Sequence, residues 1–452
     1  MKTHFSNFGA AIANLRPEDL LIRSLGERTI ESPMEPFFAQ SGNSHAFYSD
    51  DNRVLIDHSL AGAQKLIDRH GSIPCFEVAG PRRKIFFDPQ KTSCAIVTCG
   101  GLCPGLNDVI RAIVLQATYR YGISRVYGIP YGFEGLNPAY GHKILKLTPD
   151  AVSNIHRFGG TRLGTSRGPQ DSMVMVDRLV ELGVNILFVI GGDGSQRGAK
   201  SIEEEAHRRG LKLAVVGVPK TIDNDMIFMD KSFGYETAVA AAVEVVHAAH
   251  TEAVSSRNGV GLLKLMGRHS GFIACSAAIS SGEVNMVLIP EVPFALHGPN
   301  GLLQNLSHRI ESRGHAVVIV AEGAGQNLLA ANGARDASGN ARLQDVGPFL
   351  KEEIERHFKR TNTELNLKYI DPSYIIRSVP ASPQDRIYCM RLAQAAVHAG
   401  MAGKTGIVVA RWHSTYVHLP VTVATSERRH VDPGGDLWLS VLEATGQSAR
   451  YY

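Results

Sequence analysis

Long apolar runs are absent from the sequence, in which no stretch approaches about 18 consecutive apolar residues. This absence excludes a helix that crosses a membrane. Residues 1–16 also lack the continuous apolar segment of a secretory signal, although their partly amphipathic character leaves organelle targeting open as an alternative.

Cysteine pairs and basic runs are missing as well. None of the six cysteines forms a C-x-x-C pair and most have apolar neighbours, so zinc binding is disfavoured and the reduced thiols of a cytoplasmic protein are expected. No run of Lys and Arg exceeds a few residues and the net charge is only +4, which gives nucleic-acid binding little support.

The composition is that of an ordinary soluble globular protein. The chain has 452 residues, of which 44% are hydrophobic and 20% charged. A chain of this length can bury large cores and is typical of about two or three domains.

The most informative stretch of the chain is 186–225. Five apolar residues at 186–190 predict a buried parallel strand, a Gly-Gly-Asp-Gly-Ser turn follows at 191–195, and a helix is predicted over 196–210. This order is a phosphate-binding geometry, because residues without a Cβ atom let backbone N–H groups approach an anion at a helix N-terminus. Asp193 in the turn can supply a carboxylate oxygen to Mg2+.

A second predicted strand, 213–218, leads into Pro-Lys-Thr-Ile-Asp-Asn-Asp at 219–225. Asp223 and Asp225 stand two residues apart at the end of this strand, which suits a catalytic base and its neighbour better than a solvated face. A phosphate cradle and a candidate base on successive strands of one sheet indicate phosphoryl transfer.

Other predicted strands also end in residues that can do chemistry. The strand at 94–99 runs into a glycine-rich turn at 100–107 and a helix over 108–121, although an ordinary tight turn explains these glycines equally well. Arg162 and Arg167 lie in a glycine-dense loop at 159–168 and can grip phosphate oxygens, the alternative being solvated loop arginines.

The second half of the chain shows the same pattern. Arg268 follows a predicted strand at 260–265, and Glu322 and Gly323 follow another at 316–321. Further strands are predicted at 125–129, 284–289 and 405–410, and further helices over 236–256, 348–360 and 385–400.

Strands that alternate with helices, with polar residues at the strand ends, predict a doubly wound α/β fold. Some eight strands exceed one ordinary sheet, so two Rossmann-like domains with ligands between them are expected. The predicted boundaries are an N-terminal extension over 1–92, a first α/β domain over 93–233 completed by about 378–435, a second over 234–377, and a C-terminal tail over 436–452.

Taken in order, these motifs resemble the phosphofructokinase family, whose members phosphorylate fructose 6-phosphate at its 1-hydroxyl. The resemblance covers residues 75–435. Its motifs are CGGLCPGLN at 99–107, LGTSR at 163–167, GGDGS at 191–195, PKTIDND at 219–225, MGR at 266–268 and EG at 322–323. A Gly-Gly-Asp-Gly turn alone also occurs in unrelated nucleotide and lipid kinases, whereas the ordered set is specific.

The resemblance implies a role for each matching residue. Asp223 is similar to the base that takes the proton of the sugar hydroxyl, with Thr221 beside that hydroxyl, Asp225 in support, and Arg268 countering charge on the transferred phosphoryl group. Asp193 is similar to the residue that positions Mg2+.

The remaining implied contacts concern the two substrates. In the first domain, those with the nucleotide involve Gly101, Phe133, Arg167, Gly168, Gly192, Asp193, Gly194, Ser195, Gly198 and Lys220. In the second domain, those with the sugar phosphate involve Met266, Gly267, Arg268, Glu322, Lys368, Tyr374 and Arg377, together with Thr221 and Asp223.

Two departures place the chain within the family. Bacterial members carry an arginine nine residues before the position of Arg268, where this chain has Gly259, and a histidine where it has Tyr374. With Lys220, these differences resemble the branch that includes the pyrophosphate-dependent enzymes and the ATP-dependent enzymes of plants and trypanosomes. The bacterial effector site therefore cannot be copied onto this chain.

The identity of the phosphoryl donor depends on Gly194. Pyrophosphate-dependent members carry aspartate there, and a carboxylate would crowd and repel the α-phosphate of a nucleotide. Gly194 therefore favours ATP, whereas Lys220, also found in pyrophosphate users, favours the alternative.

The resemblance thus implies an ATP- and Mg2+-dependent 6-phosphofructokinase at the committed step of glycolysis, allosterically regulated and assembled as a homo-oligomer, most often a tetramer. Two alternatives stay open, namely a pyrophosphate-dependent enzyme and an inactive sensor or regulatory subunit. The second is disfavoured because such subunits lose the base or the metal carboxylate, and this chain keeps both Asp193 and Asp223.

Overall fold

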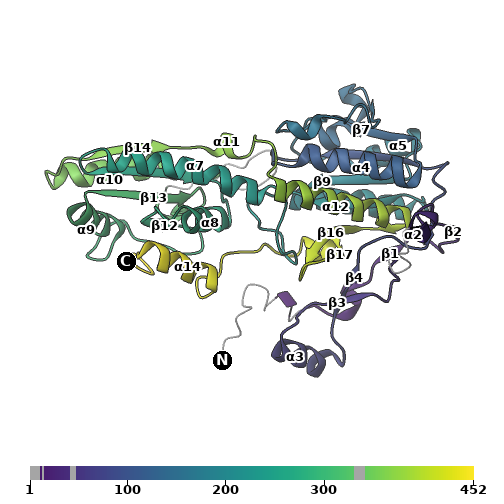
Figure 1. Ribbon diagram of the computed structural model, residues 1–452, viewed down its shortest axis with the longest axis horizontal. Helices are drawn as coiled ribbons and strands as arrows, with labels where there is room; N and C mark the ends of the chain where they lie inside the picture. Colours follow the sequence, from purple (N-terminus) through teal and green to yellow (C-terminus); the bar gives the residue numbers. More distant parts are fainter. Residues whose placement is uncertain (1–10, 13–14, 41–46, 330–341) are drawn as a thin grey trace.

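The computed structural model describes residues 11–12, 15–40, 47–329 and 342–452. Figure 1 shows the two main sheets, each with its own helices, at opposite ends of an elongated molecule. Within the described part of the chain, none of the helices is both long and apolar enough to cross a membrane.

The larger sheet has nine strands in the order β3-β4-β17-β16-β10-β9-β6-β7-β8. Its centre is parallel and consists of β7 (Arg125–Ile129), β6 (Ser93–Thr98), β9 (Ile186–Gly191), β10 (Ala214–Pro219) and β16 (Ile407–Trp412). The flanking strands are antiparallel, namely β8 (Leu145–Lys146), β17 (Thr415–Pro420), β4 (Cys75–Val78) and β3 (Arg53–Leu55).

Helices cover both faces of this sheet. The alternation of side chains along β9 sends Phe188 towards α4 (Leu106–Tyr121) and α12 (Pro383–Met401), and Leu187 towards α5 (Ser172–Glu181) and α6 (Asp193–Arg208). The expected doubly wound arrangement is therefore confirmed.

The smaller sheet has four parallel strands in the order β12-β13-β11-β14. These strands are β12 (Met286–Leu288), β13 (His315–Ala321), β11 (Gly259–Leu265) and β14 (Asn366–Ile370). The helices α7 (Tyr235–Val254) and α8 (Phe272–Ser281) pack on one face, and α9 (Leu302–Arg313) and α10 (Val346–Arg360) on the other. One continuous apolar core runs from the helices of the larger sheet to α7 and α8.

Both ends of the chain join these sheets. The predicted N-terminal extension supplies β3 and β4 to the larger sheet and also contains α3 (Leu60–His70). The segment expected as a tail contains α14 (Asp436–Thr445), whose Trp438 is buried against α8, and Tyr451, which is buried in the core under the smaller sheet. The domain boundaries themselves stay a prediction.

A buried ionic network fixes β4 to the rest of the larger sheet. Glu77 accepts hydrogen bonds from Arg82 (2.9 Å) and Lys404 (3.1 Å) and pairs with His418 of β17 (2.9 Å). Burial acts to raise the pKa of Glu77, but His418 and Lys404 outweigh it and hold that pKa at about 2. The N-terminal strands are thus held by charge pairs as well as by backbone hydrogen bonds.

Candidate active site

The turn after β9 starts α6 earlier than the sequence predicts. Gly192 is the N-cap, so Asp193 is the first helical residue and the helix covers Asp193–Arg208. The buried side chain of Gln196 donates to the carbonyl of Gly191 (2.9 Å) and to that of Val189 (3.2 Å), which fixes the turn on the end of the strand. The N-terminus of α6 therefore stands at the carboxyl end of the parallel strands.

The end of β10 is joined to the turns beside it. Lys220 donates its backbone N–H to the carbonyl of Gly191 (3.0 Å), and its buried Nζ donates to the carbonyl of Gly101 (2.6 Å) after β6. Burial lowers the pKa of Lys220. One lysine thus links three predicted motifs, those at 99–107, 191–195 and 219–225.

Cationic side chains converge on the glycine turn after β6. A Cβ atom added to Gly101 would lie 3.5 Å from Nη2 of Arg167 and 3.8 Å from Nη1 of Arg377. The Nε atom of Arg377 is buried and has no hydrogen-bond partner among the residues that the structure describes. With Lys220 on the same turn, this arrangement suits an anion such as a phosphate group.

Thr221, Asp223 and Asp225 form one hydrogen-bonded unit after β10. The hydroxyl of Thr221 donates to Oδ1 of Asp225 (2.7 Å) and accepts from the backbone N–H of Asp223 (3.2 Å). The Asp223 carboxylate accepts from the backbone N–H of Arg268, whereas its Oδ1 is buried without a hydrogen-bond partner in the described chain.

The electrostatic environment of Asp223 is that of a base. Burial, together with the negative charges of Asp225 and Glu322, raises the pKa of Asp223 to about 8. A carboxylate with a raised pKa is a stronger proton acceptor than an ordinary aspartate, and its free Oδ1 has a lone pair available for a substrate hydroxyl.

Asp193 and Asp225 converge on a single guanidinium group. Arg428 approaches Oδ2 of Asp225 at 3.2 Å and Oδ2 of Asp193 at 3.8 Å, and Arg197 also pairs with Asp193 (2.9 Å). Since both carboxylates already face one positive charge, their oxygens fit a hard cation such as Mg2+. No cluster of three or more metal-binding side chains is found among the described residues, so phosphate and water oxygens would have to complete the shell of such an ion.

The ends of β11 and β13 meet opposite these carboxylates. Gly323 donates to the carbonyl of Gly267 (3.1 Å), and a Cβ atom at Gly323 would lie 2.0 Å from the carbonyl oxygen of Arg268. Only glycine allows this approach, which brings Glu322 and Arg268 into one region. Burial raises the pKa of Glu322, an effect that Arg268 opposes.

The residues expected around the sugar phosphate differ in exposure. Tyr374 is 73% exposed and its ring lies 4.7 Å from the guanidinium carbon of Arg377. Lys368 is exposed on the edge strand β14, where it pairs with Gly261 well before the end of β11. Lys264 of β11 points to the site side instead, where it pairs with Asp371 (2.8 Å) and acts on the charge of Glu322.

The residues expected around the nucleotide also differ in how far they are exposed to solvent. Phe133 is buried, and a Cβ atom at Gly198 would lie 2.5 Å from its ring, so this glycine makes room for the phenylalanine. Around Gly194, by contrast, no described atom beyond its chain neighbours and the backbone of its own helix lies within 4 Å of an added Cβ, and the position is exposed. Their contacts with a nucleotide stay predictions.

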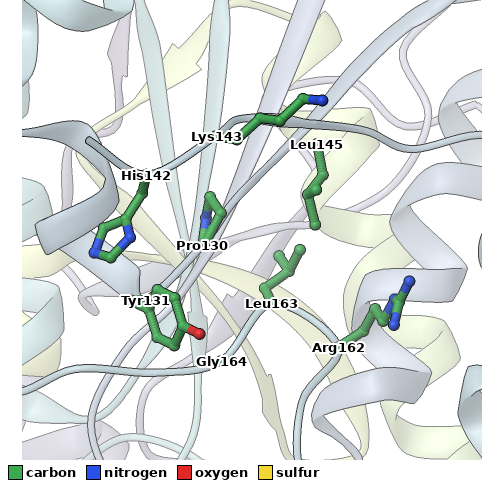
Figure 2. Close-up of a pocket in the computed structure, with 8 residues that line it drawn as sticks. All are labelled: Pro130, Tyr131, His142, Lys143, Leu145, Arg162, Leu163 and Gly164. Atoms are coloured by element: carbon green, nitrogen blue, oxygen red, sulfur yellow. The ribbon is translucent and has the colours of Figure 1, made fainter. Parts of the chain in front are cut away.

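A pocket of about 280 Å3 lies beside the loop that carries Arg167. Figure 2 shows the side chains that line it, which are Pro130, Tyr131, His142, Lys143, Leu145, Arg162, Leu163 and Gly164. Ser166 donates its hydroxyl to the carbonyl of Tyr131 (2.6 Å) and accepts at its own carbonyl from Gly100 (3.1 Å), so the wall of the pocket is continuous with the glycine turn. In Figure 2 the guanidinium of Arg162 points away from the centre of the pocket.

Three residues at the site have no signal in the local sequence. Gln196 stands within a helix, Lys264 within an apolar strand, and Arg428 in a polar segment more than two hundred residues after Asp225. The structure alone shows that Gln196 is buried in the first turn of α6, where its amide must find backbone partners.

Comparison with known proteins identifies relatives across the whole chain. The sequence model of one family, described as Phosphofructokinase, matches residues 93–400. A protein of Amycolatopsis methanolica named ATP-dependent 6-phosphofructokinase is 48% identical over 444 residues, covering 97% of this chain and 96% of its own. A Trypanosoma cruzi protein of the same name is 49% identical over 445 residues, covering 96% of this chain and 89% of its own.

The fold is also found among solved structures. The crystal structure of a pyrophosphate-dependent phosphofructokinase from Marinobacter aquaeolei superimposes with a TM-score of 0.65 at 21% identity, covering 79% of this chain and 92% of its own. The fold alone therefore does not decide between the two donors.

Proposed function

The chain belongs to the phosphofructokinase family, and on this premise we propose that it transfers the γ-phosphoryl group of ATP to the 1-hydroxyl of fructose 6-phosphate. The observation that carries the proposal is the position of Asp223. This carboxylate has a raised pKa and a free buried oxygen, and it lies in the same motif as the lysine that reaches the first glycine turn.

The nucleotide is bound at the carboxyl ends of β6 and β9. The N–H groups at the start of α6 and the glycine turns cradle its phosphates, and Arg167 and Lys220 neutralise their charge. Asp193 would hold the Mg2+ ion, with Asp225 as its supporting carboxylate. When bound, Mg2+ draws charge from the phosphoryl oxygens and fixes their orientation.

Asp223 acts as the general base. Its Oδ1 accepts the proton of the sugar 1-hydroxyl, while Thr221, held by Asp225, lies beside that hydroxyl. Arg268 stabilises negative charge on the group in transfer, and its backbone N–H keeps Asp223 in place.

The sugar phosphate is bound by the second sheet. Met266, Gly267, Glu322, Tyr374 and Arg377 form its pocket, and Lys368 adds positive charge at the edge. The unpartnered buried Nε of Arg377 supports this assignment, because such a donor needs an anionic acceptor.

ATP, rather than pyrophosphate, is the proposed donor. The open space around Gly194 leaves room for the part of a nucleotide that pyrophosphate lacks. A pyrophosphate-dependent enzyme is the second candidate, because Lys220, a residue also found in pyrophosphate users, is buried and reaches the first glycine turn.

The protein is further proposed to act as a cytoplasmic homo-oligomer, a tetramer by family resemblance. Its six cysteines are free, as a reducing compartment requires. Beside the sugar-phosphate side of the site, Tyr374 is 73% and Ile375 is 63% exposed, and a second copy that covered them would remove apolar surface from water.

A coupled assay with each donor tests the proposal. We expect turnover of fructose 6-phosphate with ATP and Mg2+, and far less with pyrophosphate. Turnover with pyrophosphate alone would refute the choice of donor, and no turnover with either donor would favour a sensor or regulatory subunit.

A further inference from the structure

Arg428 belongs to a connector, residues 425–435, that joins the two halves of the molecule. The connector leaves α13 (Val421–Ala424) beside the larger sheet and ends at α14, which packs against α8 and β12 of the smaller one (Figure 1). Arg428 forms a β-bridge with Met226, and Arg429 donates its N–H to the carbonyl of Asp225 (2.8 Å). The backbone of the connector is therefore fixed beside the carboxylates that follow β10.

The other end of the connector is held by loops that follow β11 and β12 of the smaller sheet. Val431 donates its N–H to Oε1 of Glu291 (2.8 Å), and Nδ1 of His430 contacts the carbonyl of His269 (2.7 Å). His269 directly follows Arg268. The position of Arg428 thus depends on both halves of the proposed active site.

The charges around Arg428 balance. The carboxylates of Asp193 and Asp225 face two guanidinium groups, those of Arg428 and Arg197. Arg197 lies one turn along the same helix as Asp193, is 62% exposed, and pairs with that carboxylate alone. Arg428 is the more buried of the two, with 32% of its side chain exposed, and lies between the carboxylates.

We propose that Arg428 is a positioning residue that takes the place of the metal ion between Asp193 and Asp225 until a metal–nucleotide complex binds. The inference rests on the proposed function and adds a rule for metal entry. While Arg428 and Arg197 together neutralise the two carboxylates, a free divalent cation gains little from binding them. A cation that came with nucleotide phosphates would bring its own ligands, and Arg428 would then release the two carboxylates.

Arg428 also acts on the reacting groups, through its contact with Asp225. Asp225 accepts a hydrogen bond from the hydroxyl of Thr221 on Oδ1 and another from the guanidinium of Arg428 on Oδ2. Arg428 therefore orients the Asp225 carboxylate, and this carboxylate in turn orients Thr221. Without Arg428, the ion pairs of the described residues leave the two carboxylates with Arg197, which pairs with Asp193. A bare divalent ion then becomes the best available counter-ion.

The test measures binding of Mn2+, added alone as a paramagnetic probe, by electron paramagnetic resonance of the full chain without nucleotide. Arg428→Gln is expected to bind Mn2+ about tenfold more tightly than the parent, as loss of one charge a few ångströms away implies. Arg197→Gln, which removes a guanidinium but leaves the bridge, is expected to change affinity by less than about threefold. The control Arg178→Gln, which breaks an exposed pair with Glu181 on α5, is expected to change nothing.

Two further variants locate the effect. Adding Asp193→Asn to Arg428→Gln is expected to abolish the gain in affinity. Arg428→Lys, which keeps the charge but cannot span both carboxylates, is expected to give an intermediate affinity and serves as the test if Arg428→Gln does not fold. Equal Mn2+ affinity of Arg428→Gln and the parent, or a gain that survives Asp193→Asn, would overturn the inference.

The proposed function is tested separately by Mn2+ binding in the presence of ATP. Loss of that binding in the single variant Asp193→Asn is expected from the metal role of this residue. If Asp193→Asn keeps it, the metal assignment fails, whereas if only the nucleotide-free result fails, the role of Arg428 alone is wrong.

Discussion

Gly194→Asp is the perturbation that tests the donor assignment most directly. Gly194 is the second residue of α6, and beyond its chain neighbours and the backbone of that helix no described atom lies within 4 Å of an added Cβ, so the Cβ of an aspartate meets no steric obstacle. Its backbone is helical, and a negative charge in the first turn of a helix is favourable by about 0.3–1 kcal/mol. Any loss of activity therefore comes from the ligand and not from the fold.

The magnitude follows from Coulomb repulsion between the new carboxylate and the nucleotide phosphates. Two unit charges about 5 Å apart repel by about 3 kcal/mol at an effective dielectric constant of about 20, and by just under 1 kcal/mol in bulk water. Since about 1.4 kcal/mol corresponds to a factor of ten, these limits predict a rise in KM for ATP of about 200-fold and about 4-fold respectively. A site that closes over its nucleotide should lie nearer the upper limit.

The assay compares initial rates with ATP and with pyrophosphate for the parent, Gly194→Asp and the uncharged isostere Gly194→Asn. The aspartate is expected to raise KM for ATP within the calculated range, the asparagine much less, and neither is expected to weaken use of pyrophosphate. Equal losses from both variants would show that bulk, and not charge, decides the donor. No loss from Gly194→Asp would refute the reasoning.

Three other measurements test the site and the fold. Asp223→Ser is expected to lower turnover by about 10²–10⁴-fold while the calorimetric affinity for fructose 6-phosphate is kept, because the base is removed and the pocket is not; normal turnover would contradict the assignment. Since burial, Asp225 and Glu322 raise the pKa of Asp223 to about 8, kcat/KM should rise with pH up to about that value, and Glu322→Gln should move this limb to lower pH; an unmoved limb would exclude the coupling. Glu77→Ala is expected to lower the free energy of unfolding at pH 7 by about 3–5 kcal/mol, because Arg82, Lys404 and His418 lose a buried partner. The pKa of Glu77 is about 2 in the folded protein against an ordinary 4.5, so the contribution of Glu77 to the free energy of unfolding is complete above pH 4.5 and is lost as the pH falls towards 2. The free energies of unfolding of parent and variant, measured by urea denaturation, should therefore converge near pH 2. A difference between them that does not depend on pH would show that packing dominates.

The central strands could be predicted because their residues have only one suitable environment. The runs at 186–190 and 316–321 are apolar on both faces, so they require cover on both sides, as a doubly wound sheet provides. β14 and β17 were missed because each carries a polar residue in mid-strand, Lys368 and His418, and the latter is buried only because Glu77 pairs with it.

The same reasoning applies to the site. Asp193 and Asp223 could be predicted to follow strands at the same edge of the sheet, because parallel neighbours such as β9 and β10 bring their carboxyl ends together whatever the spacing in the sequence. Arg428 could not be predicted in this way, since it reaches that edge on a connector that follows no strand of the pattern. Lys264 was hidden by its apolar neighbours, which are typical of a core strand.

The edge of the larger sheet that contains β4, β17 and β16 determines how far the chain can be shortened. β17 follows β16 in the chain and is covered on its outer edge by β4. A shortened polypeptide confined to residues 93–400 would lose β4, β16 and β17 together, and the apolar strand β10 would become an exposed edge strand. The unpaired backbone groups of β10 could then pair with strands of other molecules, and the fragment would aggregate. Recombinant production of a minimal kinase should therefore retain about the first ninety residues and the last fifty.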